Sequence, residues 1–133
     1  MQFQVATQYA ISILQYLHLH SKNAPNATTI SAAVGMTVPS FQGVACQLKR
    51  HGLLNAVQGR HGGYMLAKPA TEISVYDIFL AVEGDLQINR CLKDKQYCNR
   101  GAIDKCSTPD YFLSLQNDII MSMSNKYVTD FSQ

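Results

Sequence analysis

TTISAAVGMTVPSFQGVACQLKRHGLLNAVQGRHGGYMLAK, residues 28–68, holds three structural signals in succession. Its first part, TTISAAVG, predicts a short helix with a threonine cap and Gly35 at its end. After a tight turn at MT, VPSFQGVACQLKRHG predicts a second helix with Pro39 in its first turn and Gly52 just past its end. The apolar residues of this helix share one face: Phe41, Val44, Ala45 and Leu48. Two short helices joined by a tight turn are typical of a helix-turn-helix.

The third signal is a β-hairpin. LLNAVQ and YMLAK are short apolar segments with alternation, and the glycine-rich GRHGG between them predicts the turn. Arg60 and His61 fall at the tip, where glycines allow a close approach to a phosphate or a minor groove. Such a turn alone is more often simply solvated. Directly after a helix-turn-helix, however, the hairpin indicates the wing of a winged helix.

Helices are predicted on both sides of this stretch. ATQYAISILQYLHLHS, residues 6–21, has an apolar stripe, and SVYDIFLAVEG, residues 74–84, begins with a capping box of Ser74 and Asp77. TPDYFLSLQNDIIMSMSNKY, residues 108–127, predicts a last helix that a threonine caps. Its broad apolar face comprises Phe112, Leu115, Ile119, Ile120, Met123 and Tyr127.

The predicted fold is mainly α with a small β-hairpin. We expect a winged helix-turn-helix in residues 1–84, a cysteine-rich loop in 85–108, and a dimerisation helix and tail in 109–133. In a chain of 133 residues the broad apolar face of the last helix favours a homodimer, and the alternative is packing on its own winged helix.

Charge is distributed unevenly. Residues 1–71 carry five lysines and arginines and no Asp or Glu, whereas residues 72–133 carry nine acids and six such cations. A surface that binds a polyanion needs this absence of carboxylates, because each one near a phosphate lowers affinity. Chance in a segment rich in neutral polar residues is the alternative explanation.

No segment resembles a membrane span or a secretory signal, so we expect a soluble cytoplasmic protein with reduced thiols. Three of the four cysteines, Cys91, Cys98 and Cys106, lie within sixteen residues of a polar segment. Clustered thiols in a cytosol bind metal or sense redox state more often than they form disulfides. Cys46, on the second helix of the helix-turn-helix, is expected to be a small buried apolar residue.

Taken in order, these features resemble the Rrf-two (Rrf2) family of bacterial transcriptional regulators, which includes IscR, NsrR and RirA types. The resemblance covers nearly the whole chain and rests on MQFQVATQYAISIL, GRHGGYMLAK, ISVYDIFLAVEG and the three cysteines. It implies a dimeric winged-helix regulator with a long C-terminal dimer helix. It also implies an iron–sulfur cluster, 2Fe-2S or 4Fe-4S, that Cys91, Cys98 and Cys106 bind.

The chemistry of the segment agrees with a cluster. Thiolates hold iron–sulfur clusters, and neighbouring cations offset the negative charge: Lys93, Lys95, Arg100 and Lys105. Cys106 precedes a predicted helix, whose N-terminal dipole lowers a thiol pKa. The intervals between cysteines are longer than in zinc knuckles, so zinc is less favoured. A redox thiol pair and a loop that has lost its ligand function remain alternatives.

The fourth ligand differs from the family pattern. In IscR-type members a histidine follows the last cysteine after two residues, and this chain has Pro109 there, which cannot ligate. NsrR-type members use an acidic residue of the partner's first helix, where this chain has Gln8. Gln8, Asp110, Asp104, solvent or a small thiol could complete the site. An open, labile cluster of this kind suits sensing of iron–sulfur status, nitric oxide or oxidants.

We therefore expect a cytoplasmic repressor that binds a palindromic double-stranded operator as a homodimer and senses through its cluster. Expected DNA contacts lie on the recognition helix and the wing: Thr37, Pro39, Ser40, Gln42, Gln47, Lys49, Arg50, Gln58, Arg60 and His61. The alternatives are a cluster-free thiol-redox or partner-dependent regulator of the same fold, and a small enzyme or metal carrier. Catalysis has little support, because no paired carboxylates, Ser-His-Asp set or phosphate-binding glycine loop is evident.

Overall fold

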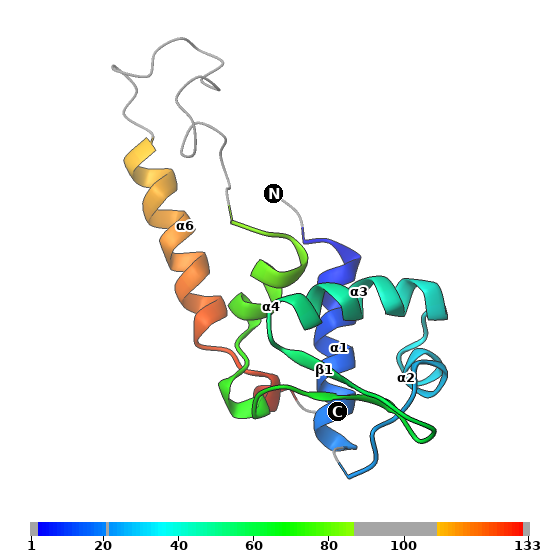
Figure 1. Ribbon diagram of the computed structural model, residues 1–133. Coiled ribbons are helices and arrows are strands. Elements are labelled where there is room, and N and C mark those ends of the chain that lie inside the picture. The colour runs from blue at the N-terminus through cyan, green and yellow to red at the C-terminus, as the bar shows by residue number, and fades with distance from the viewer. Residues whose placement is uncertain (1–2, 21, 87–108, 132–133) are drawn as a thin grey trace.

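The computed structural model describes residues 3–20, 22–86 and 109–131 (Figure 1). Its elements, in order, are α1 (Val5–Leu19), α2 (Ala27–Val34), α3 (Val38–Arg50), β1 (Leu54–Val57), β2 (Gly63–Leu66), the 3₁₀ turn η1 (Ala70–Glu72), α4 (Val75–Val82), α6 (Pro109–Ser124) and the 3₁₀ turn η3 (Val128–Asp130). The prediction of a mainly helical fold with a small hairpin, arranged as a winged helix-turn-helix, is confirmed.

Helix α1 lies at the centre of the core. Ala10, Ile13, Leu14 and Leu17 are buried on it, and α2, α3, α4, β2 and η3 pack around it. These residues recur at intervals of three, one and three, the spacing that places side chains on one face of a helix. Burying each large side chain contributes roughly 1.5–3 kcal/mol.

The helix-turn-helix forms as predicted, with one difference at its start. The cap of α2 is Asn26, whose Oδ1 accepts the Thr29 N–H at 2.8 Å, so the predicted threonine cap is wrong. Gly35 ends α2 with a left-handed φ of 84°, which a residue with a side chain rarely adopts. Thr37 then caps α3, because its Oγ1 accepts the Ser40 N–H at 3.3 Å.

Strands β1 and β2 form an antiparallel hairpin, with Leu54 opposite Leu66 and Val57 opposite Gly63. The hairpin is held against the chain before α2, because the Tyr64 N–H donates to the Pro25 carbonyl at 3.0 Å. A Cβ on Gly63 would lie 2.3 Å from the same carbonyl oxygen, so this close approach requires glycine. The Tyr64 ring also packs edge-on against Phe41 of α3, with the centroids 5.1 Å apart.

Helix α4 has the predicted capping box, in which the Ser74 hydroxyl accepts the Asp77 N–H and the Asp77 carboxylate accepts the Ser74 N–H, both at 3.1 Å. Helix α6 is shorter than predicted. It ends at Ser124, and Tyr127, assigned to it from the sequence, instead pairs with Ser74 in a β-bridge. The predicted α6 cap, Thr108, lies outside the described residues.

Helix α6 runs along one side of the winged helix and extends beyond it (Figure 1). Met123 is buried against α4, with Ile119 and Ile120 partly buried beside it, so this end packs on its own domain. Other apolar side chains of α6 are exposed: Tyr111, Leu113, Leu115 and Met121. Among the described helices, none combines the length and the hydropathy needed to cross a membrane.

A pair of glycine substitutions tests this packing. We expect Gly63→Ala to lower the free energy of unfolding by about 1–3 kcal/mol, because its new methyl group collides with the Pro25 carbonyl. Gly43 lies within α3 with open space at the position that a methyl group would take, so Gly43→Ala should raise the free energy of unfolding by roughly 0.5–1 kcal/mol. Urea unfolding followed by circular dichroism measures both, and an unaltered stability of Gly63→Ala would contradict the close contact.

Candidate nucleic-acid interface

Helix α3 presents two chemically different faces. Phe41, Val44, Ala45 and Leu48 are buried in the core shared with α1 and α4, as predicted. The opposite face is exposed and polar or small: Pro39, Ser40, Gln42, Gly43, Cys46, Lys49 and Arg50. These two sets interleave at helical spacing, so burial of the first set leaves the second set directed to solvent.

The two ends of α3 carry different chemistry. At the N-terminus the Thr37 hydroxyl donates to Ser40 Oγ at 2.8 Å, which ties together two of the predicted DNA contacts. At the C-terminus Lys49 and Arg50 occupy the last turn, where positive charge interacts favourably with the helix dipole. Hydroxyls therefore lie at one end of the exposed face and cations at the other.

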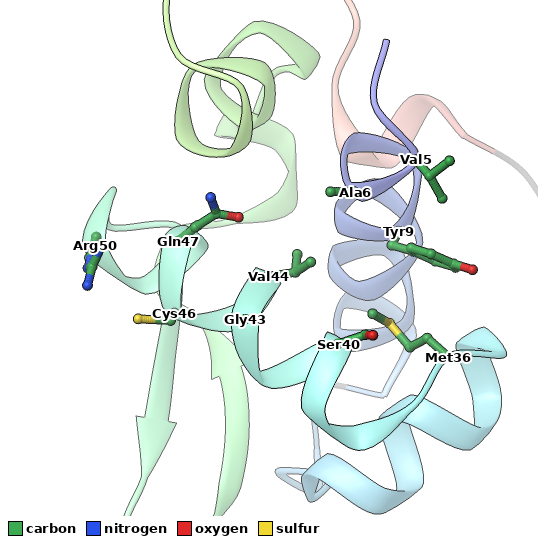
Figure 2. Close-up of a pocket in the computed structure, with 10 residues that line it drawn as sticks. All are labelled: Val5, Ala6, Tyr9, Met36, Ser40, Gly43, Val44, Cys46, Gln47 and Arg50. Atoms are coloured by element: carbon green, nitrogen blue, oxygen red, sulfur yellow. The ribbon is translucent and has the colours of Figure 1, made fainter.

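Gln47 differs from its neighbours on α3. Its side chain is half-buried, and its amide Nε2 donates to the Val82 carbonyl of α4 at 3.5 Å. Figure 2 shows the amide pointing toward α4, whereas the side chains of Cys46 and Arg50 point away from α4. The amide of Gln47 is thus engaged within the domain, although the sequence predicted it as a DNA contact.

Cys46 is exposed, so the expectation of a buried cysteine is wrong. It lies one turn from both Gln42 and Lys49, in the middle of the polar face of α3. The sequence contained a signal for this position, because residue 46 does not belong to the stripe that the buried residues define: Phe41, Val44, Ala45 and Leu48.

The hairpin carries exposed cationic and polar groups at its turn. The predicted DNA contacts Gln58, Arg60 and His61 are all exposed there. The turn is compact because the Gly62 N–H donates to the Gly59 carbonyl at 3.0 Å, and Gly59 has a φ of 112°. A Cβ on Gly62 would lie 2.2 Å from the carbonyl oxygen of residue 57, so glycine is required for this tight geometry.

A hollow of about 550 Å³ lies between α1 and α3 (Figure 2). Its lining is largely apolar, with polar groups from both helices: Val5, Ala6, Tyr9, Met36, Ser40, Gly43, Val44, Cys46, Gln47 and Arg50. Within the described part of the chain no three His, Cys, Asp or Glu side chains converge in an arrangement for a metal ion.

The predicted cluster ligands fall into two groups. Cys91, Cys98, Cys106 and Asp104 lie outside the described residues. Gln8, near the start of α1, and Asp110, in the first turn of α6, are described, and both side chains are exposed. Both are therefore accessible to a group bound from outside their own helices.

Comparisons with known proteins agree with this architecture. Residues 3–133 match the model of the Rrf2 family, described as an iron-dependent transcriptional regulator. The chain is 29% identical over 119 residues to the HTH-type transcriptional regulator IscR of Photorhabdus laumondii and 30% identical to that of Serratia proteamaculans, covering 89% of this chain and 71% of each relative.

Solved structures share the fold. IscR of T. potens has a TM-score of 0.75 at 20% identity, with 98% of this chain and 85% of that chain covered. CymR, the global cysteine regulator of B. subtilis, has a TM-score of 0.76 at 14% identity, with 98% and 95% covered. The relatives are regulators, which confirms the expectation that the chain is not an enzyme. From the family match over nearly its whole length, this chain belongs to the Rrf2 family of transcriptional regulators.

Proposed function

We propose that this protein is a cytoplasmic, homodimeric repressor that binds a palindromic DNA operator and responds to an iron–sulfur cluster on its cysteine segment, residues 85–108. The observation that carries the DNA-binding part is the exposed polar face of α3 followed by a cationic hairpin turn, in a region of sequence without any carboxylate. Membership of a family of transcriptional regulators supports the same interpretation.

Helix α3 is suited to the major groove. Gln42 can pair with the adenine edge through its amide, and Lys49 or Arg50 can contact guanine or phosphate oxygens. Ser40 and Thr37 supply hydroxyls near the N-terminus of α3, where backbone N–H groups also favour phosphate. Beside them, residue 39 contributes the apolar surface of a proline ring. In this proposal residue 47 has a supporting role, because its amide is directed to α4.

The hairpin is suited to the adjoining minor groove. Arg60 and His61 project from a turn whose glycines keep the backbone compact, so a cationic side chain can enter a narrow groove. Gln58 at the same turn adds an uncharged donor and acceptor. Contacts on both α3 and the hairpin would fix the orientation of the domain on the duplex.

A second copy would cover exposed apolar side chains of α6. Tyr111 and Met121 are each 63% exposed and Leu113 is 46% exposed, on a helix that extends beyond the rest of the domain. Two domains related by a two-fold axis present two α3 helices, which matches a palindrome with half-sites about one helical turn apart.

The cysteine segment supplies the donors that a cluster needs. Cys91, Cys98 and Cys106 are three thiols, and cluster iron prefers thiolate ligands. Bound there, the cluster would supply a redox-active and chemically labile centre. Gln8 or Asp110 would offer an oxygen as fourth donor, since both side chains are exposed. A weak oxygen donor leaves the site open to small reactive molecules.

A cluster-free thiol-redox or partner-dependent regulator is the second candidate. It is favoured by the residues at the two positions where family members carry a fourth ligand. Gln8 stands at the position of the NsrR-type carboxylate, and Pro109 stands at the position of the IscR-type histidine. Zinc on the same cysteines would give a third, purely structural, outcome of the metal analysis.

Replacing one cysteine tests the cluster. We expect Cys98→Ala to lose its iron, sulfide and visible absorption when purified without oxygen, because two thiolates cannot replace three. Cys46→Ala, which removes the α3 thiol, should retain all three signals. Iron and sulfide analysis with absorption spectroscopy measures this. Wild-type protein without iron but with operator binding would favour the thiol-redox candidate, and stoichiometric zinc would favour a structural site.

Replacing one cation tests the DNA interface. We expect Lys49→Ala to weaken operator binding about three- to thirtyfold and to reduce the slope of log K against log salt by about 0.9, as for one lost phosphate contact. Lys126→Ala removes an exposed lysine that lies beyond α6 and should bind as wild type. Fluorescence anisotropy at several salt concentrations measures both, and equal effects of the two substitutions would argue against α3 as the contact.

Two aspartates on α6 test the dimer. We expect Leu113→Asp with Met121→Asp to produce monomers at micromolar concentration, because charge on an apolar interface must be desolvated. The matched control is Ser114→Asp with Ser122→Asp, which has the same spacing and added charge on exposed polar positions. Sedimentation velocity measures the mass, and a dimer that survives the first pair would exclude these side chains from the dimer interface.

A further inference from the structure

The last turn of α4 contacts both helices that shape the DNA-binding face. This turn ends at Val82, is followed by Glu83 and Gly84, and leads to the cysteine segment. The φ of Gly84 is 85°, a left-handed conformation that turns the chain away from the helix axis. Leu86, two residues on, is buried again in a cluster with apolar side chains of α4 and α6. Described residues therefore anchor the chain on both sides of Gly84.

Glu83 binds the start of α1. Its Oε1 accepts the Gln4 N–H at 3.2 Å, and its Oε2 accepts the Thr7 hydroxyl. The first turn of α1 contains no acidic residue, and its N-cap Gln4 makes no side-chain cap of its own. A carboxylate at a helix N-terminus satisfies free N–H groups and interacts favourably with the dipole. Glu83 supplies this to α1 from the end of α4.

Gln47 binds the same turn from the side of α3. The carbonyl of Val82 belongs to the last turn of α4, where carbonyls have no partner within their own helix. The amide of Gln47 reaches it at 3.5 Å, which is longer than a typical N–H···O hydrogen bond, so the contact is weak. Val44, Ala45, Ala81 and Val82 belong to one buried core cluster, so α3 and α4 also pack together through apolar side chains.

Helix α4 also connects to α6 and to the N-terminus. Phe79 packs with Leu86 and Met123, and its ring meets Phe3 edge-on with the centroids 5.5 Å apart. The end of α4 thus contacts α1 through the Glu83 carboxylate and α3 through the Val82 carbonyl.

We propose that Gln47 and Glu83 are positioning residues for DNA binding, which fix the orientation of α3 and α1 to the last turn of α4. This inference rests on the proposed function, because the signal in question is the presence or absence of the proposed cluster. That signal would change the orientation of α3 through the last turn of α4. Gln47 thereby acts on DNA affinity through helix orientation, whereas Gln42 acts by direct contact.

The two glutamines of α3 make a matched test. The readout is the ratio of operator affinities of the reconstituted and cluster-free proteins, by fluorescence anisotropy. We expect Gln47→Ala to bring this ratio about two- to fivefold closer to one while operator binding and the cluster spectrum persist. Gln42→Ala should weaken both forms alike and leave the ratio unchanged. A wild-type ratio in Gln47→Ala would overturn the proposal.

A second measurement does not depend on a cluster. In cluster-free protein we expect Glu83→Ala to increase amide hydrogen exchange in residues 5–19 at least about twofold, since α1 then loses its contact with the end of α4. Glu72→Ala, an exposed acid in η1, should leave exchange in α1 unchanged. Unchanged α1 exchange in folded Glu83→Ala overturns the proposal. If cluster reconstitution leaves the operator affinity of the wild-type protein unchanged, that result contradicts the proposed function instead. The hydrogen-exchange result then tests this inference by itself.

Discussion

The burial of one face of α3 is the constraint on which the rest of the architecture depends. Phe41 and Leu48 are fully buried, and the core that receives them is built from α1, α4 and β1. A helix turns through about 100° per residue, so fixing this face also fixes the direction of Gln42 and Lys49. The interface is thus a consequence of the core, and a change in how α3 sits on α4 alters every contact that it offers.

Helix α4 supports the DNA-binding region in two ways. The region that forms α1, α2, α3 and the hairpin has no carboxylate in its own sequence, so its cations are not neutralised locally. Helix α1 nevertheless needs an acceptor at its N-terminus, and Glu83 at the end of α4 provides it. The same short helix packs on α1, α3 and α6 and leads into the cysteine segment. It therefore offers a physical means by which the proposed DNA contact, dimer helix and cluster could influence one another.

Much of this could be predicted from local sequence. Periodicity and capping residues predicted the helix-turn-helix, the capping box of α4 and the glycine-dependent hairpin, because these features depend on residues close together in the sequence. The apolar residues of α3 predicted its buried face, and its exposed face could be predicted as the opposite one. The cap of α2 was predicted wrongly because Asn26 competes with the adjacent threonines, and an amide oxygen is an equally good acceptor.

Only the tertiary structure decided what depends on distant partners. Gln47 and Gln42 are chemically identical, yet one meets a carbonyl of α4 and the other faces solvent. Glu83 lies at the unfavourable end of its own helix and acquires its role from α1, which is 76 residues away in sequence at Thr7. Sequence periodicity assigns a face to a side chain, but the neighbour on that face is fixed by how the helices pack.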